Sequence, residues 1–144
     1  MIPPTGARRR AREVAFRVAY QADLAGDAYP LAWKLRREHE EQLSDDQVGL
    51  IEDVIGALEA RGPEIDSELL TSMEGRWAMT RLAATDRAVL RVSVAELLAR
   101  PGSPARVVLD EAIEIARTFG SDKSGRFVNG VLDRAARRLR PAEF

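Results

Sequence analysis

Apolar residues recur at helical spacing along almost the whole chain, and no segment keeps the alternation typical of a β-strand. The most apolar of these segments covers residues 86–99, where apolar side chains occupy nearly the whole circumference of a helix. A helix that is apolar on all sides is buried, so we expect this one at the centre of the fold. The sequence therefore predicts an all-α protein.

Helix-breaking and capping residues divide this pattern into about seven helices. The predicted helices cover residues 8–25, 30–42, 45–60, 63–70, 86–99, 104–119 and 122–139, and residues 77–82 form about one further turn. The connector Glu74-Gly75 separates an N-terminal subbundle, about residues 7–73, from a C-terminal subbundle, about residues 76–140. A chain of 144 residues is expected to form a single domain, residues 1–144.

Local signals set some of these boundaries and faces. Gly62-Pro63 is expected to end one helix and begin the next, because proline removes a helical hydrogen bond. Thr85 is expected to cap the central helix. In the segment 30–42, Leu31 and Leu35 are expected to face the core.

The composition excludes several kinds of site. The chain has no cysteine and one histidine, His39, which excludes a disulfide framework and multi-histidine or thiolate metal sites. No phosphate-binding glycine loop or nucleophile motif is present. No apolar run approaches the ~20 residues that span a bilayer, and the first residues lack the apolar core of a secretory signal. We therefore expect a cytoplasmic protein without a catalytic residue, metal or cofactor.

Glu96 is a candidate buried carboxylate, since it lies among apolar residues in Val94-Ala95-Glu96-Leu97-Leu98. Burial would raise its pKa and make it a candidate acid or base. Pairing with an arginine is the more frequent arrangement for such a residue, and it is the one that we predict.

Charge is distributed unevenly along the chain. The net charge is +4 over residues 7–21, −11 over residues 38–75 and +5 over residues 117–140. If the two basic ends meet in space, they form a surface that attracts a polyanion. A helical bundle with solvated, balanced charges is the alternative that charge alone leaves open.

The first helix carries aromatic residues among arginines. Arg9, Phe16 and Tyr20 lie opposite its alanine and valine stripe, and the two rings are neighbours at i and i+4. Such a surface suits stacking of unpaired bases and binding of phosphates. If the helix is buried on two sides, both rings are core residues instead, an alternative that we favour for Phe16 and leave open for Tyr20.

The last helix begins after a run of small residues, Gly120-Ser121-Asp122-Lys123-Ser124-Gly125-Arg126. Exposed amides at a positive helix end can bind an anion. An ordinary serine or aspartate cap is the common alternative.

Four stretches resemble the NusB family of bacterial transcription antitermination factors. They are Ala7-Arg8-Arg9-Arg10-Ala11-Arg12-Glu13, Thr85-Asp86-Arg87-Ala88-Val89-Leu90-Arg91-Val92, Leu109-Asp110-Glu111-Ala112-Ile113-Glu114-Ile115-Ala116 and Arg126-Phe127-Val128-Asn129-Gly130-Val131-Leu132-Asp133. They occur in the family's order over nearly the whole chain, whereas residues 29–75 match only in length and helical pattern.

This resemblance implies an all-α fold of two helical subdomains and a role without enzymatic activity or cofactor. Members of the family pair with NusE, a small-subunit ribosomal protein, and bind the single-stranded boxA element of nascent RNA. That complex helps RNA polymerase to read through terminators, chiefly in ribosomal RNA operons.

The resemblance also implies which residues form the RNA surface. They are Arg8, Arg9, Arg10, Arg12, Tyr20, Lys123, Ser124, Arg126, Phe127 and Asn129. Asp86 matches a family acid near the edge that contacts RNA and NusE. Lys123 departs from the family pattern, in which relatives can carry an acid, and a lysine there favours phosphate.

Three alternatives stay open at this point. NusB-like domains also occur at the N-terminus of ribosomal RNA cytosine methyltransferases, an interpretation that needs a cofactor-binding domain after Phe144. The chain could instead be a helical scaffold that binds protein only. It could also be a homodimer that masks its RNA surface until NusE arrives, since family members differ in oligomeric state.

Overall fold

The computed structural model describes residues 5–144, which form six α-helices and two short 3₁₀-helices and contain no strand. The α-helices are α1 (Thr5–Ala25), α2 (Tyr29–Arg37), α3 (Asp45–Ser72), α4 (Ala84–Ala99), α5 (Ala105–Phe119) and α6 (Asp122–Leu139). The 3₁₀-helices are η1 (Met79–Arg81) and η2 (Pro141–Glu143). Residues 1–4, which belong to the predicted domain and to the segment considered for a secretory signal, lie outside the described residues.

Helix α4 is the central element, as its apolar sequence predicts. It packs against α1, α3, α5 and α6, and its Val89, Leu90 and Val94 are completely buried. The predicted cap is wrong, however. The helix begins at Ala84, before Thr85, and its N-cap residue Ala83 has no side chain that can accept a hydrogen bond.

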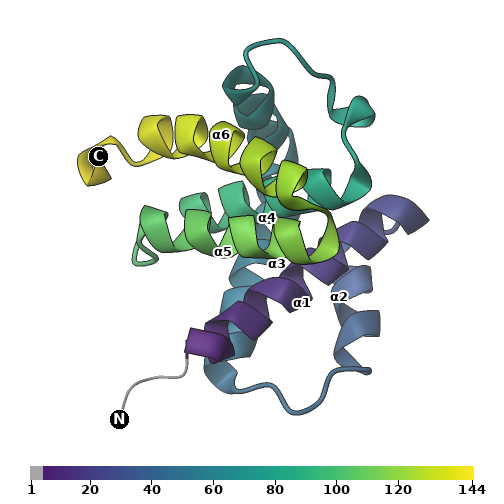
Figure 1. Cartoon of the computed structure of the whole chain (residues 1–144). Coiled ribbons are helices and arrows are strands. Elements are labelled where there is room, and N and C mark those ends of the chain that lie inside the picture. The colour runs from purple at the N-terminus through teal and green to yellow at the C-terminus, as the bar shows by residue number, and fades with distance from the viewer. Residues whose placement is uncertain (1–4) are drawn as a thin grey trace.

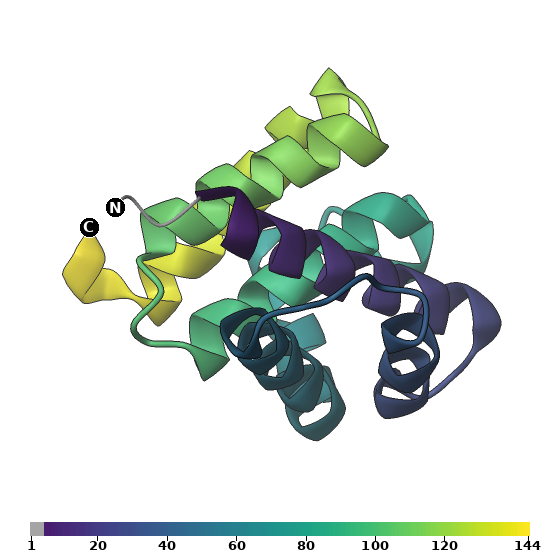
Figure 2. The same ribbon diagram turned by 90° about the horizontal axis from the view of Figure 1, so that it is seen from below.

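The other helices surround α4 on two sides (Figure 1). Helices α5 and α6 form an antiparallel pair on one side, and α1, α2 and the first half of α3 lie on the other, while the end of α3 also contacts α6. Figure 2 shows α1 between α5 on one flank and α2 and α3 on the other. The start of α1 therefore has neighbours on both flanks, and this position sets the surroundings of its arginines.

The number of helices differs from the expected seven because the third and fourth predicted helices form one element. Helix α3 continues through Pro63, and the break is reduced to a kink at Arg61, whose φ and ψ are −127° and 23°. Ile65 and Leu69 beyond the kink are completely buried. Their packing holds the second half in line although the proline removes one helical hydrogen bond.

Helix α2 is shorter than predicted and turns a different face inward. It ends at Arg37 instead of Gln42, and Ala32 and Trp33 are buried, whereas Leu31 and Leu35 are exposed. The Trp33 indole N–H donates to Glu52 at 3.0 Å, which ties α2 to α3. This contact with a distant carboxylate helps to turn the helix face that carries Trp33 toward the core, so that the face with Leu31 and Leu35 is left at the surface.

Candidate RNA interface

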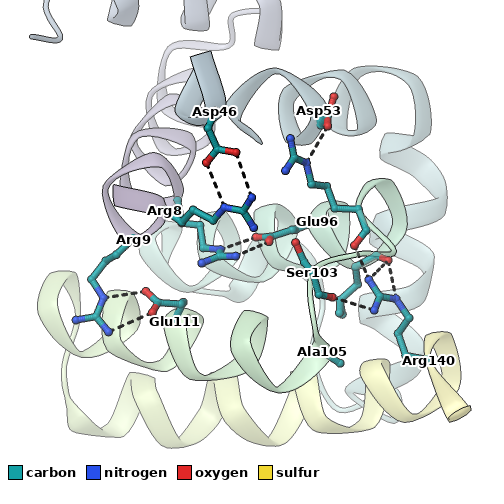
Figure 3. Close-up of polar contacts among 12 residues, drawn as sticks. Arg8, Arg9, Asp46, Asp53, Glu96, Ser103, Ala105, Glu111 and Arg140 are labelled. Atoms are coloured by element: carbon teal, nitrogen blue, oxygen red, sulfur yellow. Dashed lines mark hydrogen bonds and ion pairs between the residues drawn. The ribbon is translucent and has the colours of Figure 1, made fainter. Parts of the chain in front are cut away.

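The arginine-rich start of α1 is bound to carboxylates on both of its flanks (Figure 3). Arg8 donates through Nε and Nη2 to Asp46 of α3 at 3.2 and 3.1 Å. Arg9 donates through Nε and Nη2 to Glu111 of α5 at 2.8 and 3.2 Å. Both arginine side chains remain about half exposed, at 48% and 47%. Each therefore keeps N–H groups within reach of solvent or a ligand.

Arg10 supports the connection between α2 and α3. Its Nη1 and Nη2 donate to the carbonyl oxygens of Gln42 and Glu41 at 3.4 and 2.9 Å, and Nη2 lies 3.6 Å from the Glu40 carboxylate. The side chain is 38% exposed. Arg10 thus lies at the surface, and its guanidinium also orders this irregular segment.

Arg12 does not lie on the surface where the sequence placed it. Its Nε and Nη2 donate to the two carboxylate oxygens of Glu96 at 2.8 Å each. Both side chains are buried, with 9% and 3% exposure. The pair joins α1 to α4, which confirms that Glu96 is paired with an arginine. Arg12 is therefore removed from the predicted RNA surface, because its guanidinium fork is occupied inside the core.

An aromatic hollow of about 550 Å³ lies beside α1, near its second half. Phe16, which is buried, lies 6.0 Å from the Tyr20 ring and 4.9 Å from the Phe119 ring, measured between centroids. The Arg17 guanidinium lies 4.8 Å from the Phe119 centroid. The hollow is lined by Phe16, Arg17, Tyr20, Gln21, Leu24, Ala25, Arg36, Thr85 and Phe119.

The burial of the two rings differs, and it bears on the role of each. Phe16 belongs to the core, which is the alternative that the sequence favours for it. Tyr20 is half-buried and lines the open hollow, so its ring is available to a ligand. An aromatic floor beside a guanidinium suits an unpaired nucleobase.

A second hollow of about 220 Å³ lies between η1 and the first turns of α4 and α6. It is lined by Trp77, Arg81, Leu82, Ala83, Asp86, Ser121, Lys123, Ser124 and Phe127. The Trp77 and Phe127 rings meet edge to face at 5.9 Å. Thr85 of α4 lines the first hollow, and the next residue, Asp86, lines the second.

Asp86 is the most unusual polar group of the second hollow. Its Oδ1 is buried without a hydrogen-bond partner in the described part of the chain. Burial raises the pKa of Asp86, and the Ser124 hydroxyl offsets part of that rise. Residues 5–144 therefore leave one carboxylate oxygen of Asp86 without a hydrogen bond, and an N–H or O–H group of a bound partner would supply that bond.

The corner before α6 has the serine cap that the sequence offered as the alternative to an anion site. Ser121 is the N-cap residue and accepts a hydrogen bond from the Ser124 N–H at 3.2 Å. A Cβ at Gly120 would lie 2.8 Å from the Ala116 carbonyl oxygen, so only glycine fits this tight corner. Lys123 and Arg126 follow on the exposed surface and form no ion pair within residues 5–144.

The other cationic residues at the end of the chain are bound to protein. Arg134 donates to the Ser72 carbonyl, Arg138 to the Glu68 carboxylate, and Arg140 to the carbonyls of Leu97, Arg100 and Ser103. The two basic ends therefore do not meet as complete surfaces. The first turns of α6 supply the free cations of this end.

Apart from the buried Arg12, the predicted site residues fall into three groups. Tyr20, Asp86, Lys123, Ser124 and Phe127 line the two hollows. Arg126 and Asn129 are exposed on α6 but line neither hollow. Arg8, Arg9 and Arg10 lie at the other end of α1, about 16 Å from Tyr20 by the rise of eleven helical residues.

Phe119, Trp77 and Arg17 are among the lining residues that the sequence does not predict as site residues. Phe119 follows the inward stripe of α5, which assigns it to the core, and Trp77 falls in a short predicted turn. Arg17 contributes only to the charge of its segment. One sequence signal could have indicated Phe119: it is the last residue of its predicted helix, before Gly120, and side chains at helix ends are often partly exposed.

Two further features are absent from the described residues: a group of metal ligands and a membrane-spanning helix. Within residues 5–144, no three histidine, cysteine or acidic side chains are grouped as metal ligands. None of the described helices combines the length and apolarity that crossing a membrane requires.

The chain is similar in sequence to known bacterial proteins over nearly its whole length. A transcription antitermination protein NusB from Anaeromyxobacter dehalogenans strain 2CP-1 is 40% identical over 142 residues, which are 96% of each chain. One from Koribacter versatilis is 38% identical over 139 residues, 94% of this chain and 92% of the relative.

Solved structures agree with these sequences. NusB from T. maritima superposes with a TM-score of 0.85 at 32% identity, covering 99% of this chain and 97% of that one. A structure of the antitermination factors NusB and NusE in complex with double-stranded RNA matches with a TM-score of 0.84 at 26% identity, covering 93% and 98%. The model of the NusB family matches residues 9–137, and the chain belongs to that family.

Proposed function

We propose that this protein is a transcription antitermination factor that binds boxA RNA of nascent transcripts together with NusE. In this role it helps RNA polymerase to read through terminators, chiefly in ribosomal RNA operons. Relatives that match over nearly the whole chain are transcription antitermination proteins. A structural neighbour of 26% identity is a NusB bound to NusE and RNA.

The observation that carries this proposal is the position of the aromatic hollow. Tyr20, Phe119 and Arg17 line it, while Arg8 and Arg9 lie on the same helix as Tyr20 and Lys123 lines the second hollow. Single-stranded RNA needs both kinds of contact, since phosphates bind cations and unpaired bases stack on rings. The hollow supplies the stacking surface, and the cationic side chains supply contacts along the backbone.

The proposed RNA surface is smaller than the one expected from the sequence. It consists of Arg8, Arg9, Arg10, Tyr20, Lys123, Ser124, Arg126, Phe127 and Asn129, without the buried Arg12. A binding role of this kind requires no catalytic residue, metal or cofactor. Transcripts are made in the bacterial cytoplasm, and we place the protein there.

Titration of labelled boxA RNA with the chain alone and with NusE, at two salt concentrations, tests the proposal. We expect the chain to bind boxA RNA, more tightly with NusE, and both affinities to fall as salt rises. Binding of NusE without any gain in RNA affinity would instead support a scaffold that binds protein only. A scrambled RNA of equal length serves as the control for sequence preference.

Replacing Arg8 and Arg9 with alanine is expected to weaken boxA binding most strongly at low salt. Each phosphate contact on single-stranded RNA contributes about 0.7 to the slope of log K against log salt, so two contacts contribute about 1.4. The slope, measured by fluorescence anisotropy, should flatten by about that amount. The double variant Arg37→Ala/Arg61→Ala loses the same charge from exposed ion pairs elsewhere and should keep the parent slope.

Replacing Asp86 with asparagine is expected to weaken NusE binding without lowering the melting temperature at pH 7. Because burial raises the pKa of Asp86, this group favours the folded state only while its carboxyl is protonated. The contribution of Asp86 to the free energy of unfolding is complete below the unfolded pKa of about 3.9 and is lost as pH rises through the folded pKa. The ionised carboxylate therefore does not stabilise the fold at neutral pH. Melting curves and calorimetric titration with NusE measure the two effects.

Asp45→Asn provides the matched control, because Asp45 is also in the first turn of a helix but is exposed on α3. It should leave NusE binding unchanged. A lower melting temperature of Asp86→Asn with unchanged NusE binding would assign Asp86 a purely structural role.

A further inference from the structure

Two arginines of the proposed RNA surface already hold anions in the geometry that a phosphate would need. Arg8 and Arg9 each present two N–H groups to both oxygens of one carboxylate, from Asp46 and Glu111 respectively. A guanidinium binds a phosphate through the same forked geometry. A phosphate that binds through Nε and Nη2 therefore competes with the carboxylate for that face of each arginine.

The fold supplies these two carboxylates from different elements. Asp46 lies in the first turn of α3, and Glu111 lies midway along α5, so the start of α1 is flanked by an acid on each side (Figure 3). The Glu111 side chain is 12% exposed, whereas its partner Arg9 is 47% exposed. In this pair the cation is open to solvent and the anion is largely covered, whereas Asp46 is 55% exposed beside an Arg8 that is 48% exposed.

From this geometry we infer that Asp46 and Glu111 are built-in competitors of RNA phosphate, which set the affinity threshold of the arginine-rich start of α1. The inference rests on the proposed RNA-binding function and adds a restraint to that site. RNA gains the Arg8 and Arg9 contacts only after displacing or sharing these two carboxylates. Weak, nonspecific binding of other polyanions is reduced by the same competition.

The expected size of this restraint follows from the exposure of the arginines. Partly exposed ion pairs are weak, so each carboxylate should lower RNA affinity by about 1.5- to 5-fold. The restraint should shrink as salt screens both the internal pair and the phosphate contact.

The test replaces each carboxylate by its amide of equal shape. Asp46→Asn, Glu111→Gln and the double variant are titrated with boxA RNA at low and moderate salt. We expect each single variant to bind about 1.5- to 5-fold more tightly and the double variant about 2- to 25-fold more tightly at low salt. Melting curves verify that the variants remain folded.

Glu64→Gln is the matched control for charge. It removes one negative charge from a forked pair with Arg61, with distances of 2.8 and 2.6 Å, on the same helix as Asp46 but eighteen residues later. That separation is about 27 Å along a helix, well beyond the Debye length at 0.1 M salt. Its RNA affinity should equal that of the parent.

A double-mutant cycle separates competition from simple repulsion of RNA by a nearby acid. If Asp46 acts by occupying Arg8, Asp46→Asn should give no gain in a chain that already carries Arg8→Ala. The same holds for Glu111→Gln in the Arg9→Ala background. A gain that persists in these backgrounds assigns the effect to repulsion and overturns the inference.

The remaining outcomes are equally distinct. RNA binding by the parent with no gain in either amide variant overturns the competition and leaves the proposed function in place. No RNA binding by the parent or by any variant, with or without NusE, overturns the proposed function and the inference together.

Discussion

Replacing Arg12 with alanine is expected to lower the free energy of unfolding by about 3–5 kcal/mol. The variant leaves the Glu96 carboxylate buried between α1 and α4 without its counterion, and removal of one partner of a buried pair has effects of this size. A buried charge without a counterion carries a large desolvation penalty. Urea unfolding followed by circular dichroism measures the loss.

Two further variants test whether the loss of stability comes from the unpaired, buried Glu96. Arg12→Met combined with Glu96→Leu should recover much of the stability, because apolar residues of similar volume often replace a buried pair without penalty. Arg8→Ala breaks a half-exposed pair and should change stability little. A loss below about 1 kcal/mol for Arg12→Ala would contradict the burial of this pair.

The arginines of α1 illustrate how far the sequence predicts a site. Arg8, Arg9, Arg10 and Arg12 are chemically identical and nearly adjacent, and helical spacing alone places Arg12 at the edge of the polar face. Its burial depends on Glu96, which is 84 residues away and faces it across the helix interface. Such a pairing exists only after α1 and α4 have packed, so no local pattern contains it.

Helix positions follow from local patterns more reliably than the faces and junctions do. The apolar circumference of residues 86–99 is sufficient to predict the central helix, because a helix that is apolar on every side avoids water only at the centre of a fold. Spacing alone assigns Leu31 and Leu35 to the core, and the Trp33 contact with Glu52 overrides that spacing. At Pro63, buried residues on both sides of the kink keep one helix where the local signal indicates two.

The two hollows could not be predicted because each is built from segments far apart in the sequence. Tyr20, Thr85 and Phe119 come from α1, α4 and α5. Helical spacing indicates a stacking surface at Tyr20, but neither the spacing nor the resemblance assigns an RNA-binding role to Phe119 or Arg17. Their participation follows from the tertiary contacts that bring the end of α5 against the middle of α1.

Replacing Tyr20 with alanine is expected to weaken boxA binding by about 1–3 kcal/mol, or about 5- to 150-fold. The ring lines the aromatic hollow and lies 6.0 Å from the buried Phe16, which supports it from below. Stacking of one base on an aromatic side chain contributes a free energy of this size. Fluorescence anisotropy with labelled boxA RNA measures the change, with NusE present at saturation.

Two further variants separate stacking from packing. Tyr20→Phe keeps the ring and should bind like the parent, whereas Tyr20→Leu keeps apolar volume, removes the ring and should bind as weakly as Tyr20→Ala. Because stacking releases no counterions, the salt slope should stay at the parent value in all three variants, unlike the flattened slope of the Arg8 and Arg9 variant. Parent-like affinity of Tyr20→Leu would show that RNA does not stack on this ring, and an altered slope would place a phosphate contact beside it.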